Sequence, residues 1–180
     1  MAVSQAAAKV EYAMGHMPGA ATKQDVSNPD NNPAWADPND KMKALVWEGK
    51  NSARVVDVSK PAIIEDRDVI LKVTGSTVCG SDLHLLHGTI VEMQKGDVLG
   101  HEFMGAVDEM GPAVKGLNKG DRVVVSFQIA CGECERTNKN TLEHEMYGGP
   151  TAGFFGYSHF TGGFAGGQAE YVRVPFGSRL

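Results

Sequence analysis

The most constraining feature of this sequence is a succession of short runs rich in β-branched residues, separated by turn-forming residues. Short β-branched runs predict strands, and frequent turns between them predict an antiparallel barrel or sandwich. The 22 glycines fit this interpretation, because glycine adopts the positive φ values that tight turns require. Only residues 81–87 suggest a helical turn. We expect a mainly β fold, a partly open barrel with a few short helices. The expected strands cover residues 43–47, 53–58, 68–74, 102–108, 122–127 and 168–174.

Two segments lie outside this pattern. Residues 1–41 are dense in Asn, Asp and Pro towards their end and have no hydrophobic period. We therefore expect a disordered N-terminal extension ahead of an ordered domain at 42–180. Residues 148–167 are rich in glycine and aromatic residues and also lack a period, which is typical of a functional or mobile loop. The chain stops soon after a predicted strand, and we interpret that end as a truncation.

Charge and hydropathy exclude several classes of function. The net charge is -5 and no cluster of Lys and Arg stands out, so we expect no nucleic-acid partner. No apolar run reaches the length of a membrane span, and no export signal begins the chain. We therefore expect no membrane partner and a cytoplasmic location. The three cysteines then predict reduced thiols rather than disulfides. No G-x-G-x-x-G motif links a strand to a helix, so a dinucleotide-binding fold is not expected within these residues.

Two short motifs carry residues suited to metal chemistry. The first is Cys-Gly-Ser-Asp-Leu-His, residues 79–84, and the second is Gly-His-Glu, residues 100–102. Thiolate and imidazole are favoured zinc ligands, and a catalytic zinc uses three protein ligands and one open position. Taken singly, each residue also has a structural reading. A lone cysteine is commonly a buried apolar residue, and Ser81 with Asp82 would also cap a short helix.

Three longer patterns carry a resemblance to a known family. They are Gly100-His-Glu-x2-Gly105-x5-Gly111-x2-Val114, Lys119-Gly-Asp-Arg-Val123 and Gly167-Gln-Ala-Glu-Tyr-Val172. These patterns resemble those of the zinc-dependent medium-chain alcohol dehydrogenases, over about Met42 to Arg179. The glycine-rich loop and the strand after it are most similar to the subgroup that contains glutathione-independent formaldehyde dehydrogenase. The resemblance implies the N-terminal, GroES-like catalytic domain of such enzymes, without the Rossmann coenzyme domain.

The resemblance also implies a catalytic zinc site. Cys79 and His101 match two zinc ligands, and Glu102 matches a carboxylate beside the metal. Asp82 matches the carboxylate that orients the zinc-bound histidine, as such imidazoles usually require. Alcohol dehydrogenases are themselves a known example of zinc held by two Cys and one His, so this geometry is implied by the resemblance alone. In the family the third ligand lies beyond the end of this sequence.

Two further residues match a proton path. Ser81 corresponds to the hydroxyl that hydrogen-bonds the substrate alcohol, and His84 to a relay towards solvent. A hydroxyl-to-imidazole chain of this kind suits proton removal at neutral pH. The resemblance implies NAD(P) as the hydride acceptor in full-length relatives and a small alcohol or aldehyde as substrate. It is also compatible with a homo-oligomer.

A second metal motif departs from the family pattern. The family has a closed structural zinc site with four cysteines, whereas this chain has only Cys131 and Cys134. Thr137 and Glu145 stand where the other two cysteines would be. His144 and a carboxylate are an alternative completion, but four ligands are needed for a closed tetrahedral site. We expect a vestigial site that binds no tight structural zinc.

Three interpretations of function remain. The first is a zinc-dependent, NAD(P)-linked alcohol or aldehyde oxidoreductase, present here as a fragment that we expect to be inactive alone because it lacks a coenzyme fold. The second is a non-catalytic β-barrel module that binds zinc. The third is a defective product of a truncated gene.

Overall fold

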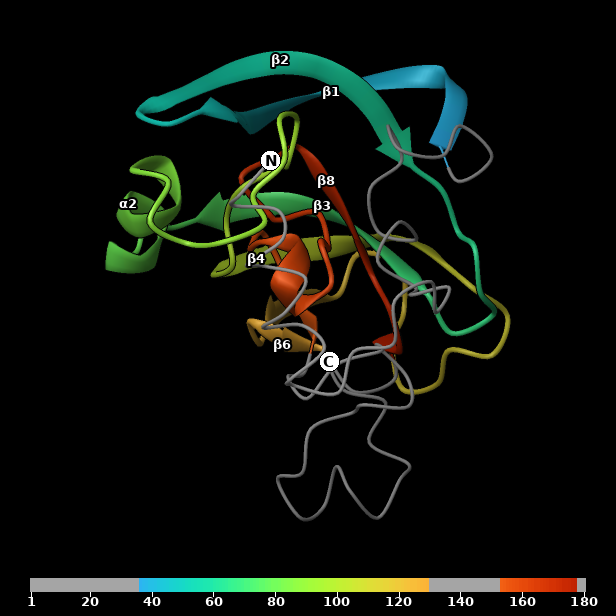
Figure 1. Cartoon of the computed structure of the whole chain (residues 1–180). Coiled ribbons are helices and arrows are strands. Elements are labelled where there is room, and N and C mark those ends of the chain that lie inside the picture. The colour runs from blue at the N-terminus through green and yellow to red at the C-terminus, as the bar shows by residue number, and fades with distance from the viewer. Residues whose placement is uncertain (1–35, 130–152, 178–180) are drawn as a thin grey trace, which may run out of the picture.

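The computed structural model describes residues 36–129 and 153–177 as an arrangement of strands with one α-helix (Figure 1). A four-stranded antiparallel sheet has the order β5-β4-β3-β8, and β1 with β2 and β6 with β7 form separate two-stranded sheets. The strands are β1 (Ala36–Gly49), β2 (Ser52–Pro61), β3 (Val69–Ser76), β4 (Phe103–Met110), β5 (Arg122–Val125), β6 (Gln128–Ile129), β7 (Gly153–Phe154) and β8 (Tyr171–Val174).

Single bridges join the long β1–β2 hairpin to the rest of the fold. Ala44 pairs with Ala169, and Val46 pairs with Val98. In Figure 1 the hairpin lies across one side of the four-stranded sheet, and the sheets do not close into a continuous ring. The expected mainly β, partly open barrel is thus confirmed. No helix in the described part of the chain is both long and apolar enough to cross a membrane.

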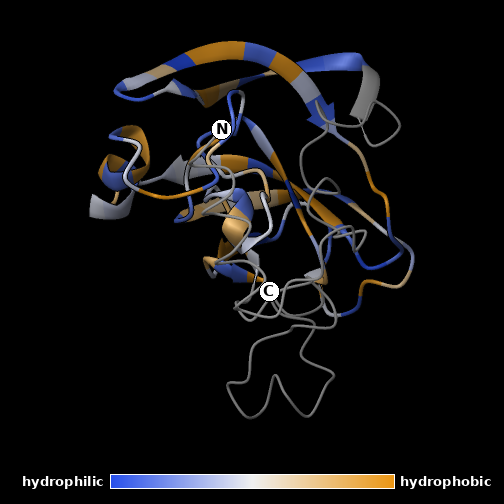
Figure 2. Ribbon diagram, in the orientation of Figure 1, coloured by the Kyte–Doolittle hydropathy of each residue, from blue (hydrophilic) through white to orange (hydrophobic). Residues whose placement is uncertain are grey.

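Two hydrophobic clusters hold these layers together. One lies against the four-stranded sheet, and the other lies under the hairpin, where Met42, Ala44 and Val46 face inward. Along β4 buried and partly buried residues alternate, as expected for a strand with one face on the core. Figure 2 shows both polar and apolar bands along β2. The larger cluster contains Val69, Leu71, Phe103, Val107, Val125, Ile129, Phe155, Phe164, Val172, Val174 and Phe176.

A buried ion pair fixes the start of β3 against β8. The guanidinium of Arg173 donates to Asp68 Oδ2 over 2.9 Å, and the two side chains are 3% and 2% exposed. The same carboxylate oxygen accepts the backbone N–H groups of Ile64 and Glu65. Buried charges are stable only with such partners, so this pair closes the turn that leads into the sheet.

The helix α2 (Gly80–Leu86) begins directly after Cys79. Asp82 folds back over the first turn, and its Oδ2 accepts the Cys79 backbone N–H over 2.8 Å. A carboxylate in the first turn satisfies a donor that the helix leaves unpaired. The helical turn expected at 81–87 is therefore confirmed. The cap is also the reason why Cys79 has a defined position at the helix start.

The described part of the glycine-rich segment, residues 153–167, is mostly buried. It contains β7 and a 3-10 helix (His159–Thr161), and it packs on the loop ahead of β4. Gly156 has φ +54, and a Cβ there would overlap the backbone of Gly100. A functional or mobile loop was expected over residues 148–167; the described part is packed, and residues 148–152 lie outside the described residues. Because glycine has no side chain, backbone packs directly on backbone, and the segment is buried without a hydrophobic period.

Several sequence expectations concern residues that the structure does not describe. Residues 1–35, where most of the disordered extension was expected, lie outside the described residues, as do Cys131 and Cys134. The first strand begins at Ala36, earlier than the expected start of order at residue 42. Its first part contains Pro and Asp, which are depleted in strands. The β propensity of these residues therefore did not indicate a strand.

Candidate metal centre

Three potential metal ligands come together beside the end of β3. The Sγ of Cys79, a ring nitrogen of His101 and a carboxylate oxygen of Glu102 all lie within 4.8 Å of one another. Cys79 precedes α2, and the other two precede β4. The two segments are tied by a hydrogen bond from the Thr77 backbone N–H to the Glu102 carbonyl over 3.0 Å. The local fold therefore places residues from two sequence motifs at one point.

His101 is held by a buried carboxylate. Its Nδ1 lies 3.4 Å from Asp82 Oδ1, and the two side chains are 8% and 7% exposed. Neither atom has a hydrogen-bond partner of good geometry among the described residues. The carboxylate of Asp82 outweighs the opposing effect of burial and raises the pKa of His101 to about 9. With Nδ1 facing Asp82, Nε2 is the nitrogen left to face a metal.

Cys79 is partly exposed and lies in surroundings that favour its thiolate. The Ser81 backbone N–H, then the His101 side chain and the Ser81 hydroxyl, lower the pKa of the Cys79 thiol. The Sγ of Cys79 lies 3.8 Å from Ser81 Oγ. Hydrogen bonds to the charged form stabilise it, and a thiolate is the form that binds metals.

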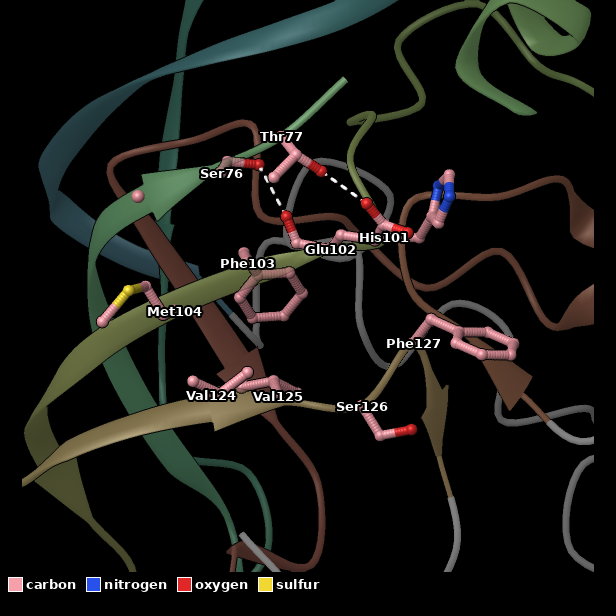
Figure 3. Close-up of a pocket in the computed structure, with 11 residues that line it drawn as sticks. Ser76, Thr77, His101, Glu102, Phe103, Met104, Val124, Val125, Ser126 and Phe127 are labelled. Atoms are coloured by element: carbon pink, nitrogen blue, oxygen red, sulfur yellow. Dashed lines mark hydrogen bonds between the residues drawn. The ribbon is translucent and has the colours of Figure 1, made fainter. Parts of the chain in front are cut away.

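Glu102 is exposed, and a neighbouring hydroxyl fixes its carboxylate. Thr77 Oγ1 donates to Glu102 Oε2 over 2.5 Å, and Ser76 Oγ donates to the Glu102 carbonyl over 3.2 Å. Figure 3 shows both bonds beside the ring of His101. The carboxylate is thus held close to the other two ligands, although its own side chain reaches solvent.

A cavity of about 210 Å³ opens on this cluster. A larger groove of about 480 Å³, drawn in Figure 3, runs along β4 and β5 and touches only His101 and Glu102 of the three ligands. We assign the site to the smaller cavity, because all three ligands line it. It is lined by the polar residues Cys79, Ser81, His101 and Glu102 and by the aromatic residues Phe127, Phe154 and Tyr157.

The two residues expected in the proton path differ in their position relative to the cavity. Ser81 lines the cavity beside Cys79. His84 is exposed on α2, and among the described residues no hydrogen bond joins its ring to Ser81. The geometry therefore brings Ser81 to the site, whereas His84 lies on the same helix without lining the cavity.

Sequence reasoning missed four residues of this region. Phe127, Phe154 and Tyr157 form the aromatic side of the cavity, and Thr77 orients Glu102. The only signal was the unusual density of aromatic residues in the glycine-rich segment. Their convergence on His101 depends on tertiary packing that no local pattern encodes.

The donor set fits zinc. A polarised thiol, an imidazole with one free nitrogen and a carboxylate are all ligands that zinc accepts. The buried pair of His101 and Asp82 has the arrangement expected of a metal-binding imidazole and its orienting carboxylate. Among the described residues, this is the one cluster of three or more such ligands.

Comparisons with known proteins identify the family of the chain. The family profile of the alcohol dehydrogenase GroES-like domain matches residues 65–179. The zinc-type alcohol dehydrogenase-like protein AdhB of Bacillus subtilis (strain 168) is 51% identical over 139 residues, which are 75% of this chain and 36% of that protein. A glutathione-independent formaldehyde dehydrogenase of the same organism is 37% identical over 151 residues, 74% of this chain and 36% of that enzyme.

Solved structures indicate the same family. Alcohol dehydrogenase TADH from Thermus sp. ATN1 superposes with a TM-score of 0.66 at 40% identity, covering 75% of this chain and 38% of that one. The chain thus spans little more than a third of the length of these relatives. The matched profile, the relatives and the fold together show that the chain belongs to the zinc-type alcohol dehydrogenase family and contains its GroES-like domain.

Proposed function

We propose that this chain provides the zinc-binding, substrate-orienting part of an NAD(P)-linked oxidoreductase that acts on a small alcohol or aldehyde. One observation carries the proposal: three zinc-type ligands and three aromatic side chains line the same small cavity. Pockets of this kind, apolar with a few convergent polar groups, are typical binding sites for small molecules. The family relationship supports the reaction class, and NAD(P) is the acceptor that the resemblance implies.

Each ligand has a proposed part in this site. Cys79 and His101 hold the metal, and Glu102 lies near enough to complete or adjust its coordination. Asp82 keeps the imidazole of His101 in the tautomer that leaves Nε2 free. Bound zinc supplies a Lewis acid, which lowers the pKa of a hydroxyl group beside it.

The remaining cavity residues bind substrate and move the proton. The Ser81 hydroxyl, next to Cys79, accepts the hydrogen bond of a substrate hydroxyl and passes the proton on. His84 stands one helical turn further and exposed, and it delivers the proton to solvent. The rings of Phe127 and Phe154 limit the water that reaches the reacting carbon.

A dehydrogenase assay with a fused coenzyme domain tests the proposal. The chain is joined to the remaining segment of AdhB, and NADH or NADPH formation from small primary alcohols is followed by absorbance. We expect zinc-dependent turnover that Cys79→Ala abolishes, and no turnover from the 180-residue chain alone. Zinc binding without turnover in the fusion would instead favour a zinc-binding module. Turnover unaffected by Cys79→Ala would contradict the proposed site.

A further inference from the structure

Three aromatic side chains that line the same cavity as the metal ligands form a continuous set of edge-to-face contacts that ends on His101. We call Phe127, Phe154 and Tyr157 the aromatic wall. The rings of Phe127 and Phe154 lie 5.1 Å apart at 78°, and those of Phe154 and Tyr157 lie 5.8 Å apart at 78°. The ring of Tyr157 lies 5.9 Å from the imidazole of His101 at 81°. Edge-to-face pairs at such separations attract one another.

The backbone beneath the aromatic wall is fixed on both sides. The Phe155 N–H donates to the Phe127 carbonyl over 3.1 Å, and the Gly156 N–H donates to the Phe164 carbonyl over 2.8 Å. Gly156 also packs so closely on Gly100 that it has no room for a Cβ. Tyr157 and His101 directly follow these two glycines. Their side chains therefore extend from one tightly packed backbone contact, and Tyr157 cannot move far from the imidazole.

Asp82 contacts the imidazole of His101 from one direction. Its Oδ1 lies 3.4 Å from Nδ1 without good hydrogen-bond geometry. The ring of Tyr157 supplies a second constraint from another direction. With the residues that the structure describes, the Tyr157 hydroxyl makes no hydrogen bond, so any such effect comes from the ring.

We propose that Tyr157 is a positioning residue for the metal centre, whose ring holds the His101 imidazole at the tilt that points Nε2 towards Cys79. This inference rests on the zinc site of the proposed function. It predicts that removing the ring weakens metal binding although Tyr157 offers no ligand atom to the cluster. It also predicts that a phenylalanine ring preserves the effect.

Cobalt binding to the complete 180-residue chain tests this role. The metal-free chain is titrated with Co²⁺, and the thiolate-to-cobalt absorption reports binding. Substitution of groups that orient metal ligands weakens binding by about 10- to 100-fold, and we expect about 10-fold for Tyr157→Ala and Tyr157→Leu. Tyr157→Phe should bind within about twofold of the native chain, because it keeps the edge-to-face ring. The matched control is Tyr171→Ala, a half-buried tyrosine in β8 whose ring contacts Lys60 instead.

The outcomes separate this inference from the proposed function. Native affinity in both Tyr157→Ala and Tyr157→Leu overturns the positioning role, and Tyr157→Leu alone decides if the alanine variant does not fold. An equal loss of cobalt affinity in Tyr157→Phe also overturns it, because the effect would then come from the hydroxyl. An equal loss in Tyr171→Ala overturns it as well, because the effect would then come from general destabilisation of the fold. Cobalt absorption that survives Cys79→Ala, or that the native chain lacks, contradicts the proposed metal site and the inference with it.

Discussion

At the scale of single residues, Asp82 links the fold to the candidate chemistry. One carboxylate oxygen accepts the Cys79 backbone N–H, and the other faces His101 Nδ1. The side chain is 7% exposed, so its charge depends on these partners. A helix cap and an orienting carboxylate were alternative readings of the sequence, and the structure shows that one residue occupies both positions.

Because Asp82 makes both contacts, we expect Asp82→Asn to weaken zinc binding. We expect zinc affinity to fall by about 10- to 100-fold, because the imidazole loses the carboxylate that orients it. Competition with a chromogenic zinc chelator measures the change. Asp121→Asn is the control, since that carboxylate also accepts a nearby backbone N–H, from Asn118, but lies away from the ligands. Equal affinities in the native chain and Asp82→Asn would show that Asp82 does not orient His101.

At the scale of elements, most strands were predictable because the residues within each strand indicate it without information from the rest of the fold. β3 and β8 are rich in β-branched residues, and along β4 buried and partly buried residues alternate. β6 and β7 were not predictable, since each has two residues and exists only through its partner. In the same way, the motifs predicted the ligands at α2 and β4, whereas the aromatic wall depends on how residues 153–157 pack on the loop before β4.

Because those segments approach each other closely, we expect Gly→Ala substitutions at two positions to cost different amounts of unfolding free energy. Gly100 has φ +99, and a Cβ there would lie 2.5 Å from the Gln168 side chain, whereas Gly120 has φ +94 and open space. Gly120→Ala should cost about 1–2 kcal/mol of unfolding free energy from backbone strain alone. Gly100→Ala should cost about 1–3 kcal/mol more, from overpacking. Urea denaturation measures both, and equal costs would mean that residues 153–168 do not press on this loop.

Lys60 ties the β1–β2 hairpin to the four-stranded sheet. Its Nζ lies 3.1 Å from Asp108 and 3.0 Å from Glu109 on β4, and 4.3 Å from the centre of the Tyr171 ring on β8. Burial opposes the charge of Lys60, but the hydrogen bonds to Glu109 and Asp108 raise the pKa of the ammonium above its ordinary range. Partial burial likewise opposes ionisation of Asp108, yet Lys60 holds the pKa of that carboxyl below its usual value.

These pKa shifts predict how the stability cost of Lys60→Met depends on pH. The lowered pKa of Asp108 stabilises the fold above its ordinary value of 3.8, and this contribution is lost as pH falls through the lowered pKa. The raised pKa of Lys60 keeps the ammonium charged throughout this range. Lys60→Met should cost about 1–2 kcal/mol at pH 7 and progressively less in acid. Denaturation at pH 7 and pH 3 measures the difference, and a cost independent of pH would assign Lys60 to packing alone.

At the scale of the whole molecule, one end of the fold gathers the groups for chemistry while the rest supports them. The hairpin and the buried pair of Asp68 and Arg173 contribute no residue to the lining of the cavity. Relatives of this family are nearly three times as long as the matched region, since that region covers 36% of AdhB. Under the proposed function, this domain would hold zinc and substrate, and the coenzyme would be held by residues outside the matched region.

Zinc stoichiometry in the purified chain, measured by native mass spectrometry, tests the central claim most directly. The sequence offers two candidate motifs for the metal, one around Cys79 and His101 and the other at Cys131 and Cys134, which lie outside the described residues. The account predicts one zinc per chain, lost in Cys79→Ala and in His101→Ala and retained when Cys131 and Cys134 are both replaced by serine. A zinc that survives Cys79→Ala and disappears with the double replacement would contradict it.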